Sequence, residues 1–191
     1  MVSVNETALV AAARRGDQPA FEKLVRSNQA KVYSLALRML GNQQDAEDVL
    51  QETFLSFYKN LGRFQGRSLV STYLYRLASN FALMKLRYRK SHGGRQQSLE
   101  QAAEVVARDP SPLELTERGE LRRRLDRALQ QLPAAERAVV VLRDVQGLSG
   151  SEVARVLKLS LPAMKSRLHR GRDELRRLIA QRDGPQGSER R

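Results

Sequence analysis

The stretch Ser149–Gly171, SGSEVARVLKLSLPAMKSRLHRG, carries the most specific pattern in the chain. Ser149 and Glu152 have the spacing of a capping box, which predicts that a short helix begins there. Leu159 and Ser160 then form a turn, and Ser160 can cap a second, longer helix. A short helix followed by a tight turn and a longer basic helix is the sequence pattern of a helix-turn-helix.

The second helix of this pattern is apolar on one side and cationic over most of the rest. Its apolar side holds Met164, Leu168, Leu175 and Leu178, and its cationic surface holds Lys165, Arg167, His169, Arg170, Arg172 and Arg176. In helix-turn-helix proteins the N-terminal residues of this helix reach base edges in the major groove. We therefore expect base or phosphate contacts from Lys165, Ser166, His169 and Arg170. The alternative is a solvated basic face on an ordinary helical hairpin.

The rest of the chain also has helical periodicity, because apolar residues recur three and four positions apart. The pattern predicts helices over 6–15, 17–41, 42–62, 68–86, 115–132 and 134–146, with Asp17, Asn42 and Ser68 as caps. The sequence contains no alternating strand pattern and no hairpin signal. We therefore predict an all-α fold.

The charge is distributed over two basic blocks. Residues 1–92 hold 14 basic and 7 acidic residues, residues 93–118 hold 3 and 5, and residues 119–191 hold 17 and 9, for a net charge of +13. Such a chain is attracted to a polyanion. The intervening segment is rich in Gly, Gln, Ser and Pro. We predict two small helical domains, residues 1–92 and 115–180, joined by a flexible linker over 93–114 and followed by a disordered tail over 181–191.

Composition excludes several classes of site. The chain has no cysteine and two histidines, so disulfides, thiolate metal sites and cysteine nucleophiles are excluded. Its longest purely apolar run is the six-residue stretch Ala8–Ala13, too short to span a bilayer. We expect a cytoplasmic protein without a secretory signal, a stable membrane insertion, a metal, a cofactor or a catalytic residue.

An acidic patch opens the predicted helix over 42–62. Asp45, Asp48 and Glu52 share one face of that helix by their spacing. Acids in a first turn stabilise a helix through its dipole, but this effect fades after one turn and explains Glu52 poorly. The patch would repel DNA and suits a basic protein partner. The sequence alone therefore allows two explanations of this acidic patch, stabilisation of the helix and docking of a basic partner.

Aromatic rings alternate with cations between residues 63 and 90. Phe64, Tyr73, Tyr75 and Phe81 lie among Arg63, Arg67, Arg76, Lys85, Arg87, Arg89 and Lys90. Single-stranded nucleic acid binds such surfaces, since bases stack on rings while cations hold the backbone. The alternative is that most of these rings belong to the core. We favour a core position for Phe81 and a stacking position for Tyr73, whose hydroxyl tolerates a wet surface.

Three segments resemble the bacterial sigma factors. FEKLVRSNQAKVYSLALRMLGNQQDAEDVLQETFLSFYKNLGRFQG (21–66) and STYLYRLASNFALMKLR (71–87) resemble their promoter-melting domain. LQQLPAAERAVVVLRDVQGLSGSEVARVLKLSLPAMKSRLHRGRDEL (129–175) resembles their C-terminal helix-turn-helix domain. The short chain with these two domains is similar to the extracytoplasmic-function group. The position of Tyr73 often carries Trp in relatives.

The resemblance implies a protein that binds core RNA polymerase, directs it to promoters and helps to open the DNA. It places polymerase docking on Asp45, Asp48, Gln51, Glu52 and Phe54. Together with the pattern of rings and cations, it places binding of the minus-ten single strand on Arg63, Phe64, Arg67, Ser68, Tyr73, Arg76 and Asn80. It places binding of the minus-thirty-five element on Ser160, Lys165, Ser166, Arg167, His169, Arg170 and Arg172. An anti-sigma factor is a common further partner in the group.

Two other classes of protein compete with this interpretation. A helix-turn-helix repressor or activator with a helical sensor domain would bind duplex operators by itself, usually as a dimer. A recombinase or nuclease would need clustered acidic metal ligands beside its DNA surface. The acidic cluster over 45–52 lies instead on the helix that the resemblance assigns to docking, which argues against such an enzyme.

Overall fold

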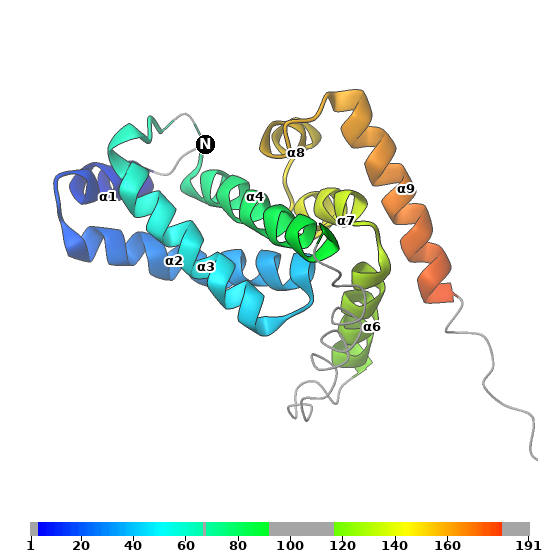
Figure 1. The fold of residues 1–191 in the computed structure, drawn as a ribbon. Coiled ribbons are helices and arrows are strands. Elements are labelled where there is room, and N and C mark those ends of the chain that lie inside the picture. Colours follow the sequence, from blue (N-terminus) through cyan, green and yellow to red (C-terminus); the bar gives the residue numbers. More distant parts are fainter. Residues whose placement is uncertain (1–3, 67, 92–116, 181–191) are drawn as a thin grey trace, which may run out of the picture.

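The computed structural model describes residues 4–66, 68–91 and 117–180, and all regular elements in these ranges are helical. The first domain contains α1 (Val4–Arg14), α2 (Gln18–Leu40), α3 (Gln43–Asn60), the 3-10 turn η1 (Leu61–Arg63) and α4 (Val70–Ser91). The second contains α6 (Glu117–Gln131), α7 (Ala134–Val140), the π-helical segment η2 (Val141–Val145), α8 (Gly150–Val156) and α9 (Leu161–Ala180) (Figure 1). The all-α prediction is confirmed, whereas the predicted linker and tail lie outside the described residues.

Local signals fix the ends of the long helices as predicted. Asp17 accepts a hydrogen bond from the Ala20 amide at 3.0 Å, and Asn42 accepts one from the Asp45 amide at 2.9 Å. Both caps satisfy amides that a helix leaves without intrahelical partners. Gly41 ends α2 with φ +69°, a left-handed conformation that glycine adopts without steric cost.

The start of α4 differs from the prediction. Ser68 was expected to cap this helix, but α4 begins at Val70, whose amide donates to Oε1 of Glu6 at 3.0 Å. A carboxylate at a helix N-terminus is favoured by the helix dipole. Arg14 also donates to the carbonyl of Gly62 at 2.9 Å. Helix α1 therefore holds the chain on both sides of the segment between η1 and α4.

The helix predicted over 134–146 is divided into two parts. Helix α7 passes at Val141 into the π-helical η2, where the Gln146 amide donates to the carbonyl of Val141 at 2.9 Å. Gly147 then turns the chain with φ +74°. Single turns of π-helix are rare and shift the side chains that follow them around the helix axis. Asp144 lies within this π-helical turn.

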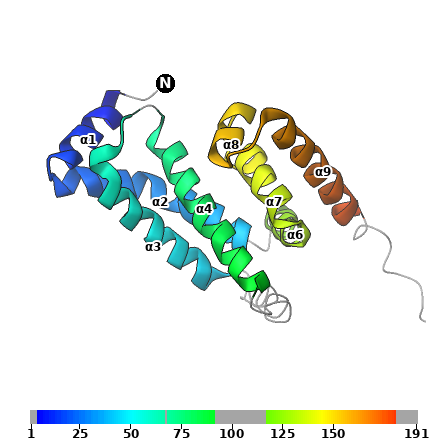
Figure 2. The same ribbon diagram turned by 45° about the horizontal axis from the view of Figure 1, so that its top comes forward.

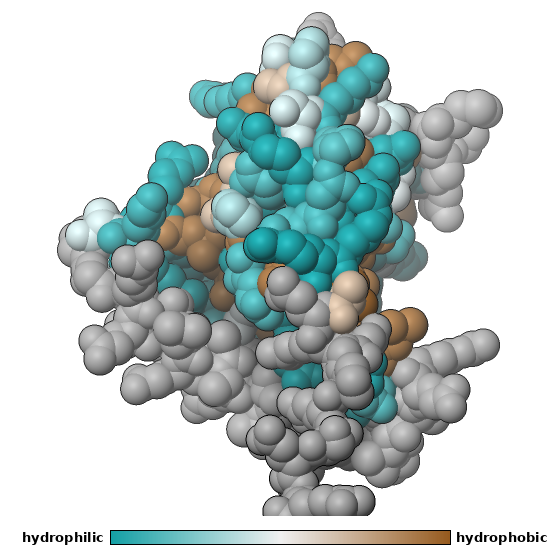
Figure 3. Space-filling model, turned by 90° about the vertical axis from the view of Figure 1, so that its right-hand side faces the viewer, coloured by the Kyte–Doolittle hydropathy of each residue, from teal (hydrophilic) through white to brown (hydrophobic). Residues whose placement is uncertain are grey.

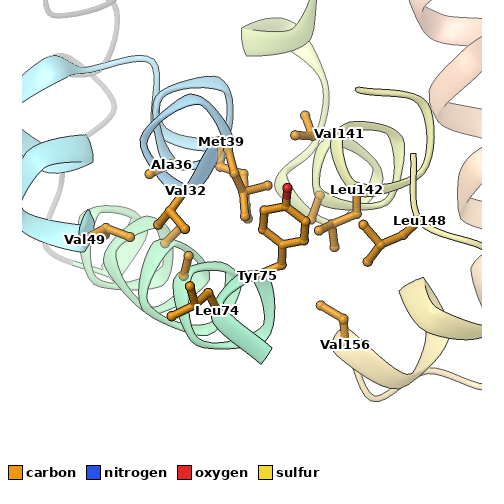
Figure 4. Packing of buried hydrophobic residues seen from close by; sticks show 14 of the residues in the cluster. Val32, Ala36, Met39, Val49, Leu74, Tyr75, Val141, Leu142, Leu148 and Val156 are labelled. Carbon is orange, nitrogen blue, oxygen red and sulfur yellow. The ribbon is translucent and has the colours of Figure 1, made fainter. Parts of the chain in front are cut away.

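The two domains pack against each other through a common apolar core. Helix α2 contacts α6, α7 and η2, and α4 contacts α7 and α8 (Figures 1 and 2). The buried ring of Tyr75 lies between Met39 of α2 and Leu142 of η2 (Figure 4). Burial raises the pKa of the Tyr75 hydroxyl. Tyr75, one of the rings considered for nucleic-acid stacking, is thus a core residue between the domains.

A buried arginine completes the contact between the domains. Arg137 of α7 donates to the carbonyl of Met39 at 2.6 Å, to the carbonyl of Gln130 at 2.7 Å and to that of Leu132 at 3.0 Å. The side-chain amide of Gln130 donates to the carbonyl of Arg38 at 2.7 Å. Burial lowers the pKa of Arg137 to about 10, so the side chain remains cationic at neutral pH. The second domain therefore caps the last turn of α2, whose carbonyls have no partners within the helix.

Candidate nucleic-acid interface

The helix-turn-helix is built as the sequence predicts. The Ser149 hydroxyl accepts from the Glu152 amide at 3.3 Å, and the Glu152 carboxylate accepts from the Ser149 amide at 2.8 Å. The Ser149 hydroxyl also donates to this carboxylate at 2.7 Å, and this bond together with the one from the Ser149 amide lowers the pKa of Glu152. Ser160 caps α9 by accepting from the Ala163 amide at 3.3 Å. A Cβ at Gly150 would lie 2.8 Å from Cε of Met164, so the two helices approach closely.

Most of the residues predicted to contact the minus-thirty-five element are exposed on this motif. Ser160, Lys165, Ser166, His169, Arg170 and Arg172 are exposed, and Arg167 is half-buried. Figure 3 views the molecule from the α9 side, where hydrophilic residues cover most of the described surface. The opposite side of α9 buries Met164, Gly171 and Leu175 against the domain. A rigid basic helix is thus presented to solvent.

The cations of α9 differ in their partners. Arg170 forms an ion pair with Glu136 at 3.0 Å, and Arg172 forms a bidentate pair with Asp144 at 2.9 and 2.5 Å. The hydrogen bonds that Arg172 donates to Asp144 raise the pKa of the Arg172 guanidinium. Lys165 makes no hydrogen bond or ion pair with any part of the chain that the structure describes. Sequence analysis predicted the cations but not these acids, since helical spacing does not show which other helix lies alongside.

The His169 ring is also engaged. Its Nδ1 lies 2.7 Å from Oδ2 of Asp173, one turn further along α9, and Asp173 in addition pairs with Arg176. The His169 side chain is nevertheless 80% exposed. These contacts lie within one helix and leave the outer edge of the imidazole accessible.

The predicted minus-ten surface combines exposed polar residues with buried rings. Arg63, Arg76 and Asn80 are exposed and Ser68 is half-buried, while Arg67 lies outside the described residues. Phe64 is buried, with its ring 5.1 Å from that of Tyr73 and 6.0 Å from that of Phe57. Tyr73 is half-buried, and the Arg76 guanidinium lies 4.8 Å from its ring centroid. Phe81, expected in the core, is half-buried and packs against it.

The acidic patch of α3 is partly neutralised by α4. Lys85 lies 3.1 Å from Oδ1 of Asp45 and 2.9 Å from Oδ2 of Asp48, and Arg89 also pairs with Asp45. Glu52 and Gln51 are exposed, and Phe54 is half-buried. Asp45 and Asp48 therefore join α3 to α4, a role that the sequence alone does not indicate.

Two exposed apolar side chains on α3 were not predicted. Leu55 is 54% exposed and Tyr58 is 61% exposed. They follow Gln51 at intervals of four and three residues, so the three side chains share one face of the helix. The signal was present in the sequence, because these positions fall on the opposite face of the helix from the buried residues Val49, Thr53 and Phe57.

No group of three or more potential metal ligands occurs in residues 4–66, 68–91 and 117–180. Within the same ranges, no helix is both long enough and apolar enough to cross a membrane.

Comparison with known proteins gives the family. Residues 24–92 match the model for "Sigma-70 region 2", and residues 122–175 match that for "Sigma-70, region 4". The ECF RNA polymerase sigma factor SigW of Bacillus subtilis is 33% identical over 172 residues, which cover 87% of this chain and 92% of SigW. The chain belongs to the extracytoplasmic-function group of the sigma-70 family. The SigE factor of Mycolicibacterium smegmatis is 38% identical over 169 residues, covering 86% of this chain and 65% of SigE.

Solved structures agree with this assignment. CnrH, in complex with the cytosolic domain of CnrY, has a TM-score of 0.67 and 25% identity, covering 93% of this sigma factor and 98% of CnrH. RpoE of Bartonella quintana, in complex with the anti-sigma factor NepR, has a TM-score of 0.66 and 20% identity, covering 84% and 96%, and supports the fold.

The protein is therefore an RNA polymerase sigma factor for transcription initiation at specific promoters, and it is not an enzyme. The predicted family and function are confirmed. The competing regulator and nuclease interpretations do not account for a region 2 domain followed by a region 4 domain in one chain.

Proposed function

We propose that α9 reads the minus-thirty-five element, that η1 and α4 capture the minus-ten strand, and that α3 docks core RNA polymerase in the bacterial cytoplasm. The observation that carries the proposal is the basic helix α9, which presents Lys165, Ser166 and His169 to solvent on a capped helix-turn-helix. Phosphate contacts from such a helix position the protein on the duplex, and base contacts give it sequence selectivity.

The minus-ten surface suits capture of an unpaired base. Tyr73 and Asn80 are seven residues apart on α4, so their side chains fall on nearly the same face. Phe57 and Phe64 support the Tyr73 ring from within the core, and a supported ring is a suitable stacking platform. The exposed amide of Asn80 offers both a donor and an acceptor to a base edge.

Strand capture is tested with Asn80→Ala and Tyr73→Ala in polymerase reconstituted with this sigma factor. Both variants should keep polymerase docking and binding to the minus-thirty-five duplex, and both should lower open-complex formation measured by permanganate reactivity of unpaired thymines. A pre-opened template should rescue Tyr73→Ala more than Asn80→Ala, since the ring mainly aids opening while the amide reads the base. Parallel loss of thermal stability, docking and melting would show that both residues only pack the domain.

We assign docking to the exposed face of α3 rather than to its paired acids. Glu52 is exposed beside Leu55 and Tyr58, which supplies charge and apolar area together, and like charges across an interface cost several kcal/mol. Glu52→Arg, alone or with Asp48→Arg, should therefore abolish association with core polymerase. Glu120→Arg makes the same charge change at an exposed position of α6, outside the docking helix, and serves as the control. Wild-type association of a folded Glu52→Arg variant would refute the assignment.

An anti-sigma factor is the further partner that we propose. Supporting this, CnrH and RpoE were solved in complexes, the latter with the anti-sigma factor NepR. A cavity of about 330 Å³ lies between the domains, with an apolar lining that includes Leu83, Leu86 and Leu157 and with Arg87 and Lys90 among its cations. This chemistry fits an acidic amphipathic helix. Leu86→Glu should abolish capture of a co-purifying inhibitor, and unchanged capture would place the inhibitor elsewhere.

A further inference from the structure

Helix α9 crosses α7 at a glycine. Gly171 is buried, and a Cβ at this position would lie 2.7 Å from Cγ2 of Val140 and 3.4 Å from Cβ of Glu136. The first of these distances is shorter than a real side chain tolerates, so the crossing depends on the absence of a Cβ. The position of α9 along α7 is therefore set by a close contact between the two helices.

Two ion pairs flank this crossing on opposite sides. Successive residues of an α-helix are about 100° apart around its axis, so with Gly171 facing α7 its neighbours Arg170 and Arg172 emerge on either side. Arg170 is held by Glu136 of α7 at 3.0 Å, and Arg172 is held by both oxygens of Asp144 of η2. The side chains of Glu136 and Asp144 are 15% and 31% exposed, so the acids are less mobile than the arginines they hold.

We propose that Glu136 and Asp144 are positioning residues that increase the sequence discrimination of α9. They restrain the rotation of α9 about its axis, and they hold Arg170 and Arg172 away from DNA phosphates. The proposal rests on the function of α9 proposed above, and it gives a different role to two cations that sequence analysis assigned to DNA contact.

The held arginines and the restrained rotation affect DNA binding differently, because phosphate contacts carry no sequence information. A cation bound to phosphate strengthens binding to every sequence equally, because the backbone is the same in all of them. An arginine that is held by a carboxylate must first leave it to reach phosphate. Lys165 has no such partner among the described residues. The acids therefore lower the affinity for all DNA by holding the arginines, and they increase the preference for the promoter by fixing the rotation at which Lys165 faces the bases.

The test uses holoenzyme assembled from core polymerase and the full-length variants Asp144→Asn and Glu136→Gln. Binding is measured against salt concentration on a promoter duplex, on the same duplex with one minus-thirty-five base pair changed, and on unrelated DNA. The salt slope is the decrease in the logarithm of the binding constant with the logarithm of the salt concentration. Each released arginine should increase this slope on unrelated DNA by about one, so that the affinity falls about fourfold more between about 50 and 200 mM salt. The preference for the intact promoter over the altered duplex should fall by about fivefold, because α9 is no longer held at one rotation relative to the bases.

Glu174→Gln is the matched control. Glu174 pairs with Arg177 within α9 at 2.6 Å, so this variant makes the same charge change without touching the crossing. It should keep the wild-type preference for the intact promoter. Equal loss of preference in Glu174→Gln and Asp144→Asn would overturn the proposal in favour of a general charge effect. Unchanged preference and salt slope in both Asp144→Asn and Glu136→Gln would overturn it as well.

A further variant separates rotation from charge. Gly171→Ala changes no charge but forces α9 away from Val140, so it should lower the preference for the intact promoter without raising the salt slope. Equal weakening on all three DNAs in Asp144→Asn, together with a lower melting temperature, would show a purely structural role. The proposed function itself fails separately if Lys165→Ala changes neither promoter binding nor transcription.

Discussion

The two candidate DNA surfaces of this sigma factor differ in how they are supported. Around Tyr73 the functional ring rests on Phe57 and Phe64, which are both buried. Along α9 the charged side chains stand on an exposed helix face, and only the opposite face is buried. Strand capture needs a rigid ring, which the core supplies, whereas duplex recognition needs cations on a rigid backbone. Function and stability are therefore coupled at the first surface and separable at the second.

Phe64→Ala should have the largest effect, because it removes the buried ring that supports Tyr73. The buried ring contacts both Phe57 and Tyr73, and truncation of a buried Phe lowers the free energy of unfolding by about 3–5 kcal/mol. Urea denaturation measures this loss, and open-complex formation should fall with it. Phe64→Leu retains most of the volume and should lose less. A loss below about 1 kcal/mol in Phe64→Ala would show that the ring does not support Tyr73.

Arg137→Met should weaken the contact between the domains while leaving both DNA surfaces unaltered. The substitution removes the donors to the carbonyls of Met39 and Leu132, and a buried acceptor without a partner costs about 1–3 kcal/mol. Urea denaturation should show a decrease of this size. Arg127→Met, on the neighbouring helix α6, is the control, since that side chain bonds within its own helix. Equal stability of the two variants would contradict the capping role of Arg137.

Lys165→Ala should change DNA binding without changing the stability of the fold. The exposed side chain has no partner among the described residues, so the free energy of unfolding should change by less than about 0.5 kcal/mol. Promoter binding should weaken by about 1–3 kcal/mol if Lys165 reads a base. If it holds phosphate, the salt slope falls by about one on all sequences. A marked loss of stability would show that the second surface is coupled to its core as well.

The smallest expected effect is the pH dependence of the capping box. Because hydrogen bonds from Ser149 lower the pKa of Glu152 in the folded protein, its contribution is complete above the unfolded pKa of about 4.5 and is lost as pH falls through the folded pKa. Glu152→Gln should remove this dependence and cost about 0.5 kcal/mol at neutral pH. The difference is measured by thermal unfolding of the wild type and of Glu152→Gln at steps of about one pH unit, between roughly pH 3 and pH 7. Identical pH profiles would contradict the assignment.

Features that depend on near neighbours were determined by the sequence alone. The caps Asp17, Asn42 and Ser149 and the helix-turn-helix follow from residues three or four positions apart, and these interactions form wherever the local helix forms. The exposed face of α9 follows from the same period. The family could likewise be recognised from quoted segments, since their order and spacing are linear properties of the chain.

Features that depend on which helices meet were decided only by the tertiary structure. Glu6 caps α4 from 64 residues away, Arg137 reaches Met39 across 98, and Lys85 reaches Asp45 across 40. In each case a charged side chain of ordinary surface type finds its partner on a helix that is distant in sequence. Glu136 and Asp144 likewise bind arginines of a helix that is distant in sequence, and these arginines were predicted from the sequence to contact DNA. Periodicity shows which face of a helix is polar, but only packing shows which opposite charge lies beside it.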